Sequence, residues 1–265
     1  MGATPLVFAH RGSSAVLPEH TLPAYLHALA EGADGLECDV RLTRDGHLVC
    51  VHDRRLDRTS NGKGRVSGHT LAELDALDFA SWAGPPEDSD FPPDPDRSRL
   101  LTLDRLLSAV RAADRPVRLL IETKHPTRHG SDVERRLVGL LRRYGLSEPG
   151  PDDAIKVTVM SFSPLAVRRI RELAPDLPTA LLLEVLPPGL RPVRLPFGAT
   201  VAAPRFHLLR TRPQLVPALK AGGNQVYVWT INEADDVDLA VEQGVDGIIT
   251  DRPGFVLRRL GRSPS

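Results

Sequence analysis

Two hydrophobic patterns alternate along this chain. Short apolar runs rich in β-branched residues predict strands, and longer stretches whose apolar residues return every three or four positions predict amphipathic helices. The expected strands are Leu6–His10, Leu36–Val40, Leu48–His52, Leu119–Thr123, Lys156–Ser161, Thr179–Leu183, Thr200–Ala203, Gln225–Ile231 and Gly247–Thr250. The expected helices are Leu22–Glu31, Leu100–Ala113, Ser131–Tyr144, Pro164–Leu173, Gln214–Ala221 and Ala234–Gln243. Strands that alternate with helices indicate an α/β fold built on a parallel sheet.

The length of the chain and the number of these elements favour a TIM-like (β/α)8 barrel. A chain of 265 residues can bury one full barrel core, so residues 1–265 are expected to form a single domain. The strand-like segments exceed by one the eight strands of such a barrel. One segment is therefore misassigned or lies outside the barrel, and the pattern does not say which.

The connection between the second and third predicted strands is too short for a helix. It consists of residues 41–47 and contains the turn signal Asp45-Gly46. Parallel strands need a longer crossover, which usually contains a helix. The regular alternation is therefore interrupted here.

A long insertion, residues 53–99, follows the third predicted strand. It holds a short helical pattern at Leu71–Leu77 and a Pro/Asp-rich stretch at Gly84–Arg97. Long loops in compact domains are usually functional or flexible. Because this one follows a candidate catalytic strand end, we expect it to cap the active site.

Charge and composition exclude several classes of protein. The 34 basic side chains balance the 34 acidic ones, so no nucleic-acid surface is expected. Met1–Ala9 has no basic leader and is too short for a membrane span, so we expect a cytoplasmic protein without an integral membrane segment. Cys38 and Cys50 lack metal-ligand spacing and are expected to be reduced core thiols. The oligomeric state is left open.

In two predicted strands, acidic residues occupy positions that the two-residue period of a strand directs to one face. In Leu36–Val40, alternation places Glu37 and Asp39 on the face opposite the apolar residues. In the fourth predicted strand the same parity directs Glu122 inward, with Lys124 just beyond the strand end. Active sites of β/α barrels lie at the carboxyl ends of the strands. The sequence therefore predicts three carboxylates that converge inside the barrel, beside one cation.

This carboxylate group predicts a metal site. Crowded carboxylates repel one another unless they bind protons or a metal, and hard oxygen ligands suit Mg2+ or Ca2+ better than zinc. We therefore predict one divalent cation, Mg2+ or Ca2+, bound by Glu37, Asp39 and Glu122. The alternative is that each carboxylate forms a salt bridge with one of the many arginines.

Two histidines stand at the ends of predicted strands. His10 ends the first strand and is followed by Arg11, and His52 ends the third and is followed by Asp53. Imidazole titrates near neutral pH, so the pair can supply a general base and a general acid beside a metal. Asp53 would either orient His52 or cap the start of the insertion.

Two cations beside these groups are candidates for phosphate binding. The planar guanidinium of Arg11 suits bidentate contact with a phosphate, and the ammonium group of Lys124 adds a point charge. Gly12 would let the backbone approach a ligand closely. The remaining histidines considered are interpreted as core, surface or loop residues: His27, His47, His69, His125, His129 and His207.

In their order and spacing, these residues resemble the glycerophosphodiester phosphodiesterase family. The resembling stretches cover most of the chain and are Ala9–Gly12, Pro18–Thr21, Leu36–Val40, Asp45-Gly46, Val51–Asp53, Arg58–Gly62, Ile121–Lys124, Ser161-Phe162, Val228–Asn232 and Gly244–Asp251. Each pattern alone is weak, but the ordered set is highly specific. The resemblance implies a TIM barrel with a capping insertion, and the roles already given to the carboxylates, histidines and cations above.

The resemblance also implies further contacts with the substrate. Trp229 would line the glycerol end of the pocket, although core packing explains an inward aromatic equally well, and Phe162 is a similar candidate. Glu19 would contact Arg11 or the metal shell, or simply begin the following helix. The family usually has asparagine at the position of His20, which adds a titratable group near the site.

Together these features predict metal-dependent hydrolysis of glycerophosphodiesters to glycerol 3-phosphate and an alcohol. The free hydroxyl beside the phosphate would attack first and form a cyclic phosphate, which water would open with the histidine roles reversed. One alternative is hydrolysis of lysophospholipids in lysophospholipase D fashion, with an apolar channel from Leu181–Leu190 and Val193–Phe197. Another is a non-catalytic barrel that binds phosphorylated ligands.

Overall fold

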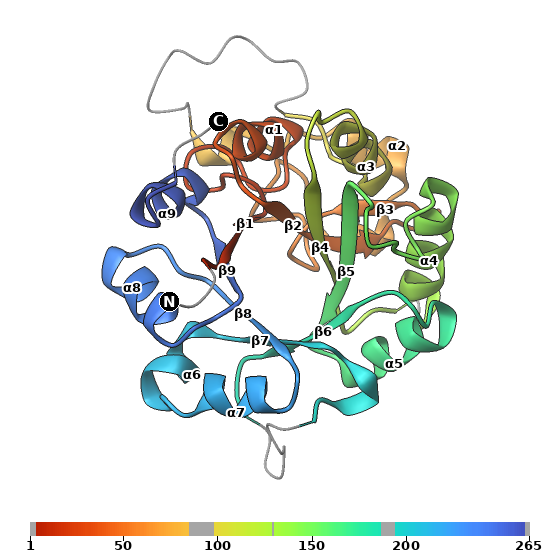
Figure 1. The fold of residues 1–265 in the computed structure, drawn as a ribbon. Helices are drawn as coiled ribbons and strands as arrows, with labels where there is room; N and C mark the ends of the chain where they lie inside the picture. Colours follow the sequence, from red (N-terminus) through yellow and green to blue (C-terminus); the bar gives the residue numbers. More distant parts are fainter. Residues whose placement is uncertain (1–3, 85–97, 129, 187–193, 263–265) are drawn as a thin grey trace.

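The computed structural model describes residues 4–84, 98–128, 130–186 and 194–262. In this part of the chain, eight parallel strands form a closed barrel, and a ninth strand is attached to it (Figure 1). The strands are β1 (Leu6–His10), β2 (Gly35–Leu42), β3 (Leu48–Cys50), β4 (Val117–Thr123), β5 (Ile155–Ser161), β6 (Thr179–Leu183), β7 (Val201–Pro204), β8 (Gln225–Val228) and β9 (Gly247–Thr250). β1 pairs with both β2 and β9, which closes the ring. The predicted TIM-like barrel is confirmed.

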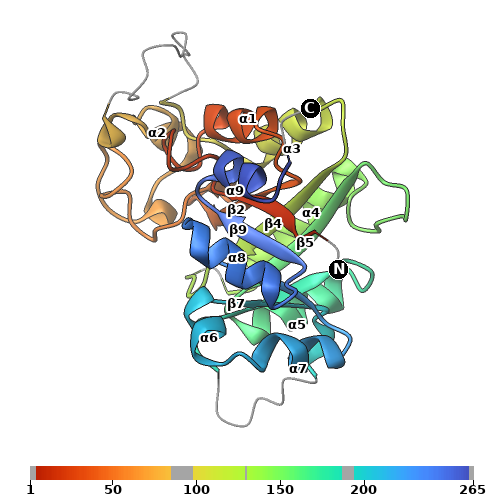
Figure 2. The same ribbon diagram turned by 60° about the vertical axis from the view of Figure 1, so that its left-hand side comes forward.

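Helices surround this ring of strands (Figures 1 and 2). They are α1 (Leu22–Ala30), α2 (Leu71–Asp75), α3 (Leu103–Arg111), α4 (Asp132–Tyr144), α5 (Pro164–Leu173), α6 (Phe206–Thr211), α7 (Leu215–Ala221), α8 (Ala234–Glu242) and α9 (Pro253–Arg259). The sequence pattern did not predict α6 and α9, which have 6 and 7 residues. None of the helices described is both long and apolar enough to cross a bilayer.

The extra strand is β3, which runs antiparallel to β2. β2 continues to Leu42, two residues beyond its last pairing with β4 at Val40. The hairpin with β3 then turns the chain back toward the barrel mouth. The predicted strand Leu48–His52 is too long, because β3 ends at Cys50. His52 therefore reaches the mouth from a returning strand and not from the carboxyl end of a barrel strand.

The insertion after β3 has a small core of its own. Between Asp53 and Gly84 it contains 3-10 helices at Val66–Gly68 and Ser81–Ala83, as well as α2, which confirms the short helix predicted at Leu71–Leu77. The buried residues of this core are Val49, Val51, Leu56, Val66, Leu74, Phe79 and Leu100. Nearly all of the Pro/Asp-rich stretch, residues 85–97, lies outside the described residues.

Apolar side chains fill the barrel below the mouth. Phe8, Leu120, Met160, Tyr227 and Ile249 belong to one buried cluster of inward-facing residues. Gly35 leaves room for the Phe8 ring, because a Cβ atom there would lie 2.7 Å from it. The acidic side chains Glu37, Asp39 and Glu122 lie beyond this apolar layer, at the carboxyl end where active sites of β/α barrels are found.

Candidate active site

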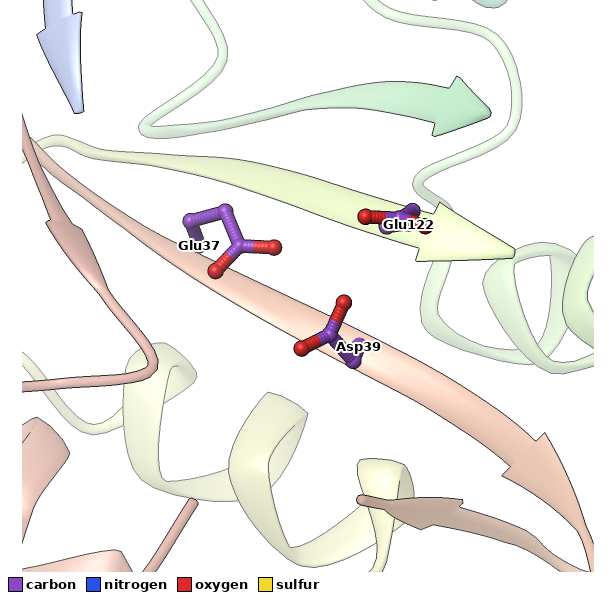
Figure 3. A group of neighbouring side chains, drawn as sticks. All are labelled: Glu37, Asp39 and Glu122. Atoms are coloured by element: carbon purple, nitrogen blue, oxygen red, sulfur yellow. The ribbon is translucent and has the colours of Figure 1, made fainter. Parts of the chain in front are cut away.

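Three buried carboxylates gather at the carboxyl end of neighbouring strands. Glu37 and Asp39 lie on β2, Glu122 lies on β4, and Asp39 is paired in register with Glu122 (Figure 3). One oxygen from each carboxylate lies within 4.8 Å of the others. The intervening apolar residues of β2, among them Cys38, pack in the outer core against the helices. The predicted alternation therefore places these three groups together.

Burial and mutual repulsion perturb the acidic cluster. Burial and the neighbouring Asp39 raise the pKa of Glu37 well above its usual range and raise that of Glu122 to about 8. Burial would also raise the pKa of Asp39, but Lys124 and His20 outweigh it and hold that pKa well below its usual range. Without an added cation, the carboxyl groups of Glu37 and Glu122 therefore favour the protonated form near neutral pH. Such a set of hard oxygen donors fits a divalent cation.

Pairing with arginines does not account for the cluster. The Nε atom of Arg11 lies 3.2 Å from Asp39, and Lys124 Nζ lies 2.8 Å from Glu122 and 3.3 Å from Asp39. The carboxylate of Glu37 forms no ion pair within the described part of the chain, and the one hydrogen bond found there for it comes from the backbone N–H of Arg11, at 3.2 Å. The alternative of one arginine for each carboxylate is therefore wrong.

His10 is oriented by a carboxylate from the other end of the chain. Its Nδ1 lies 2.6 Å from Asp251, which also accepts hydrogen bonds from Ser14 and Asn232 at 2.9 and 2.7 Å. Burial would raise the pKa of Asp251, but its bonds to His10 and the other donors lower it to about 2. An ionised Asp251 can only accept, so Nδ1 of His10 carries a proton and Nε2 remains for exchange.

His52 is oriented in the same way by its neighbour. Its Nδ1 lies 2.7 Å from Asp53, whose second oxygen accepts from Nε of Arg58 at 2.6 Å. Of the two roles considered for Asp53, orientation of His52 is the one that the geometry supports. Burial, together with Arg11 and Lys124, lowers the pKa of His52 to about 4, so the ring is neutral near neutral pH.

The loop after β1 holds Arg11 in a left-handed conformation. Arg11 has a φ of 59° and Gly12 one of 87°, and a Cβ at Gly12 would lie 2.7 Å from the backbone of Ala24. Glycine at this position is therefore needed for contact with α1. Arg11 binds Glu19 at 3.0 Å, and two nitrogens of Arg58 bind the same carboxylate, each at 2.8 Å.

A cavity of about 70 Å3 lies among these groups. Its residues are His10, Arg11, Glu37, His52, Glu122, Lys124, Met160, Phe162, Leu182, Trp229 and Ile249. Phe162 and Trp229 meet edge to face with ring centroids 5.4 Å apart. Of the ten residues predicted for the site, only Asp39 and Glu19 do not line this cavity. Asp39 belongs to the acidic cluster, and Glu19 acts on the site through Arg11.

Phe197, at the end of the second stretch proposed for an apolar channel, lies away from the site. Phe197 stacks on Arg168 and precedes β7, so it lies toward the amino end of the barrel and cannot line a channel at the mouth. Residues 187–193, the centre of the proposed apolar channel, lie outside the described residues, as does His129. His125 binds the buried Glu134 at 2.6 Å, in keeping with its interpretation as a loop residue.

Sequence reasoning gave no role to Asp251, Asn232 or Arg58. All three lie in stretches that carried the family resemblance, so a signal for them was available. Their partners could not be foreseen, because His10 and Asp251 are 241 positions apart and Arg58 joins two loops.

Comparison with known proteins agrees with this geometry. Residues 10–255 match the model of the Glycerophosphoryl diester phosphodiesterase family. A Mycobacterium tuberculosis protein named "Probable glycerophosphodiester phosphodiesterase 1" is 51% identical over 252 residues, which cover 94% of this chain and 90% of the relative. The "Glycerophosphodiester phosphodiesterase" of Caldanaerobacter subterraneus is 33% identical, with 94% of each chain covered. An Oleispira antarctica phosphodiesterase, solved with the product sn-glycerol-3-phosphate, is 25% identical with a TM-score of 0.81 and 97% of each chain covered.

Proposed function

The chain belongs to the glycerophosphoryl diester phosphodiesterase family, and we propose that it hydrolyses glycerophosphodiesters by two-histidine acid/base catalysis beside one divalent cation. The products would be glycerol 3-phosphate and an alcohol. The main support is one cavity that contains two histidines, each tethered through Nδ1, beside three buried carboxylates. The related Oleispira enzyme binds sn-glycerol-3-phosphate, in agreement with this product. Because the chain is an enzyme of this family, the alternative of a non-catalytic barrel is wrong.

Glu37, Asp39 and Glu122 would hold the cation, Mg2+ or Ca2+. Their buried, converging oxygens and the raised pKa values of Glu37 and Glu122 support this assignment. When bound, the cation would neutralise phosphate charge and make the attacking hydroxyl more acidic.

Arg11 and Lys124 would bind the phosphate oxygens. The guanidinium of Arg11 lines the cavity, and its buried Nε atom has no well-directed hydrogen bond among the described residues. Lys124 lies between the acidic cluster and the Phe162 ring, with Nζ 5.8 Å from the ring centroid. Both side chains line the cavity, and their positive charges can complement the negative charge of a phosphodiester.

His52 is the better candidate for the base in the first step. Its neutral ring can take the proton of the glycerol hydroxyl at Nε2 while that oxygen bonds to phosphorus. His10, as an imidazolium stabilised by Asp251, would give its Nε2 proton to the leaving alcohol as the phosphorus–oxygen bond breaks. Water would then open the cyclic phosphate with the two roles exchanged.

The two histidines provide the direct test. In His10→Ala and His52→Ala, hydrolysis of glycerophosphocholine is expected to fall by roughly 100-fold or more, because each variant lacks one proton-transfer group. His47→Ala, an exposed histidine outside the cavity, is the matched control. Phosphorus NMR would follow the cyclic phosphate. Wild-type rates in both site variants would exclude the mechanism.

Lysophospholipid hydrolysis is the second candidate function, because one wall of the cavity is apolar. Met160, Leu182 and Ile249 form that wall together with two aromatic rings, and Phe162 is 40% exposed at its edge. The cavity is small, so we expect glycerophosphocholine to turn over faster than lysophosphatidylcholine. Assay of both substrates after chelation and refilling with each cation decides substrate class and cofactor together.

A further inference from the structure

His20 lies beside the acidic cluster but has no part in the proposed mechanism. The residue is 6% exposed, and its backbone is left-handed, with a φ of 60°. Its Nε2 lies 2.9 Å from Oδ2 of Asp39, and its Nδ1 lies 2.8 Å from the hydroxyl of Tyr25. The imidazole therefore bridges β2 and α1.

The imidazole of His20 is fixed from both sides. Tyr25 is buried in α1, and its hydroxyl lies within hydrogen-bond distance of both Nδ1 of His20, at 2.8 Å, and the carbonyl oxygen of Glu37, at 3.1 Å. The backbone N–H of His20 donates to the carbonyl of Arg11 at 3.0 Å. Rotation of the ring would break the contacts of both nitrogens. The geometry therefore allows one orientation of the ring toward Asp39.

His20 in turn holds one oxygen of Asp39. A carboxylate can only accept hydrogen bonds, so the proton of this contact resides on Nε2 of His20. Oδ2 of Asp39 thereby faces His20 and the Nε atom of Arg11, while Oδ1 faces Lys124. The hydrogen bond from Nε2 of His20 thus sets the orientation of the Asp39 carboxylate, in which Oδ1 is directed away from α1.

We infer that His20 is a positioning residue of the cation site, which orients the Asp39 carboxylate through Nε2 and thereby sets the affinity for the divalent cation. The inference rests on the proposed function and adds a determinant of its cofactor binding. Loss of a hydrogen-bond partner of a metal ligand typically weakens metal binding by roughly 10- to 100-fold.

Two amide substitutions test the contacts of the two ring nitrogens of His20 separately. The side-chain amide of asparagine reaches only as far as Nδ1 of an imidazole, the atom that contacts Tyr25. Glutamine is one methylene longer, and its amide nitrogen can occupy the position of Nε2. His20→Asn therefore removes the donor to Asp39, whereas His20→Gln can restore it. Asparagine also tolerates a left-handed backbone, so its fold should be retained.

Calorimetric titration of the metal-free full-length protein with Mg2+ and, separately, with Ca2+ tests this inference. In His20→Asn the Kd is expected to rise roughly 10- to 100-fold. His20→Gln should recover most of the wild-type affinity. His47→Asn, at an exposed histidine that does not line the cavity, is the matched control and should bind like the wild type.

A purely structural role for His20 predicts a different result. The melting temperature of metal-free His20→Asn would fall while its Kd equalled that of the wild type, which would overturn the inference. Equal weakening of cation binding in His20→Asn and His20→Gln, with unchanged melting temperatures, would also overturn the inference. The donor restored by glutamine should recover affinity for the cation. If the wild type bound neither cation, the proposed cofactor would fail and this inference with it.

Discussion

Each histidine of the proposed acid/base pair is tethered at Nδ1 by a carboxylate. Asp251 follows β9 and Asp53 follows β3, so the two tethers come from distant parts of the chain. Both rings consequently present Nε2 as the atom free to exchange a proton. This equivalence suits a two-step reaction in which base and acid exchange roles.

Asp251→Asn tests the tether of His10. The amide removes the negative charge that stabilises the imidazolium, so kcat is expected to fall by roughly 10- to 100-fold. Asp238→Asn, a surface aspartate paired with Arg259, is the matched control and should leave kcat unchanged. An unaltered kcat in Asp251→Asn would show that His10 needs no carboxylate.

The same variant should change acid stability. Asp251 has a folded-state pKa of about 2, below its ordinary 3.8. A lowered carboxyl pKa stabilises the fold above the unfolded-state pKa, and this contribution disappears as the pH falls through the folded-state pKa. Relative to Asp251→Asn, the wild type should therefore lose up to about 2 kcal/mol of unfolding free energy between about pH 4 and pH 2. Urea unfolding at several pH values measures this difference.

At the scale of elements, the β2–β3 hairpin and the insertion complete a site that the barrel only begins. The hairpin returns His52 to the mouth, and Arg58 of the insertion binds both Glu19 and Asp53. Arg58 thereby connects Glu19, which binds Arg11, with Asp53, which binds His52. The insertion is thus tied to the proposed catalytic groups by charge and not only by its apolar core.

Arg58→Ala should loosen this connection. Hydrogen exchange in residues 53–84 is expected to accelerate, and kcat/KM to fall by roughly 10-fold, because Glu19 and Asp53 lose their shared partner. Arg55→Ala is the matched control, since Arg55 pairs with Asp57 and contacts neither carboxylate. Equal exchange rates in the two variants would mean that Arg58 does not anchor the insertion.

At the scale of the whole molecule, the barrel places a charged mouth above a layer of buried apolar side chains. The three carboxyl groups are buried with only partial compensation from Arg11 and Lys124, so ionising all three costs free energy that a bound cation would offset. Ligand binding to the folded state alone raises the free energy of unfolding.

Cation addition should therefore stabilise the whole fold. A cation at about 100 times its Kd should add about 2.7 kcal/mol and raise Tm by roughly 5 to 10 °C. In Glu122→Gln most of this shift should disappear, whereas Glu184→Gln, at an exposed glutamate paired with Arg205, should keep it. Scanning calorimetry with and without a chelator measures the shifts, and an undiminished shift in Glu122→Gln would contradict the assigned ligand.

The sequence by itself determined the α/β alternation, the barrel and the inward direction of Glu37, Asp39 and Glu122. These follow from periodicity, a local property, because each strand residue faces the side opposite to its neighbours. Only the tertiary structure decided that β3 lies outside the barrel, that His52 returns to its mouth and that Asp251 meets His10. Those facts depend on which strands pair when the barrel closes, and no local pattern records a contact between segments far apart in the chain.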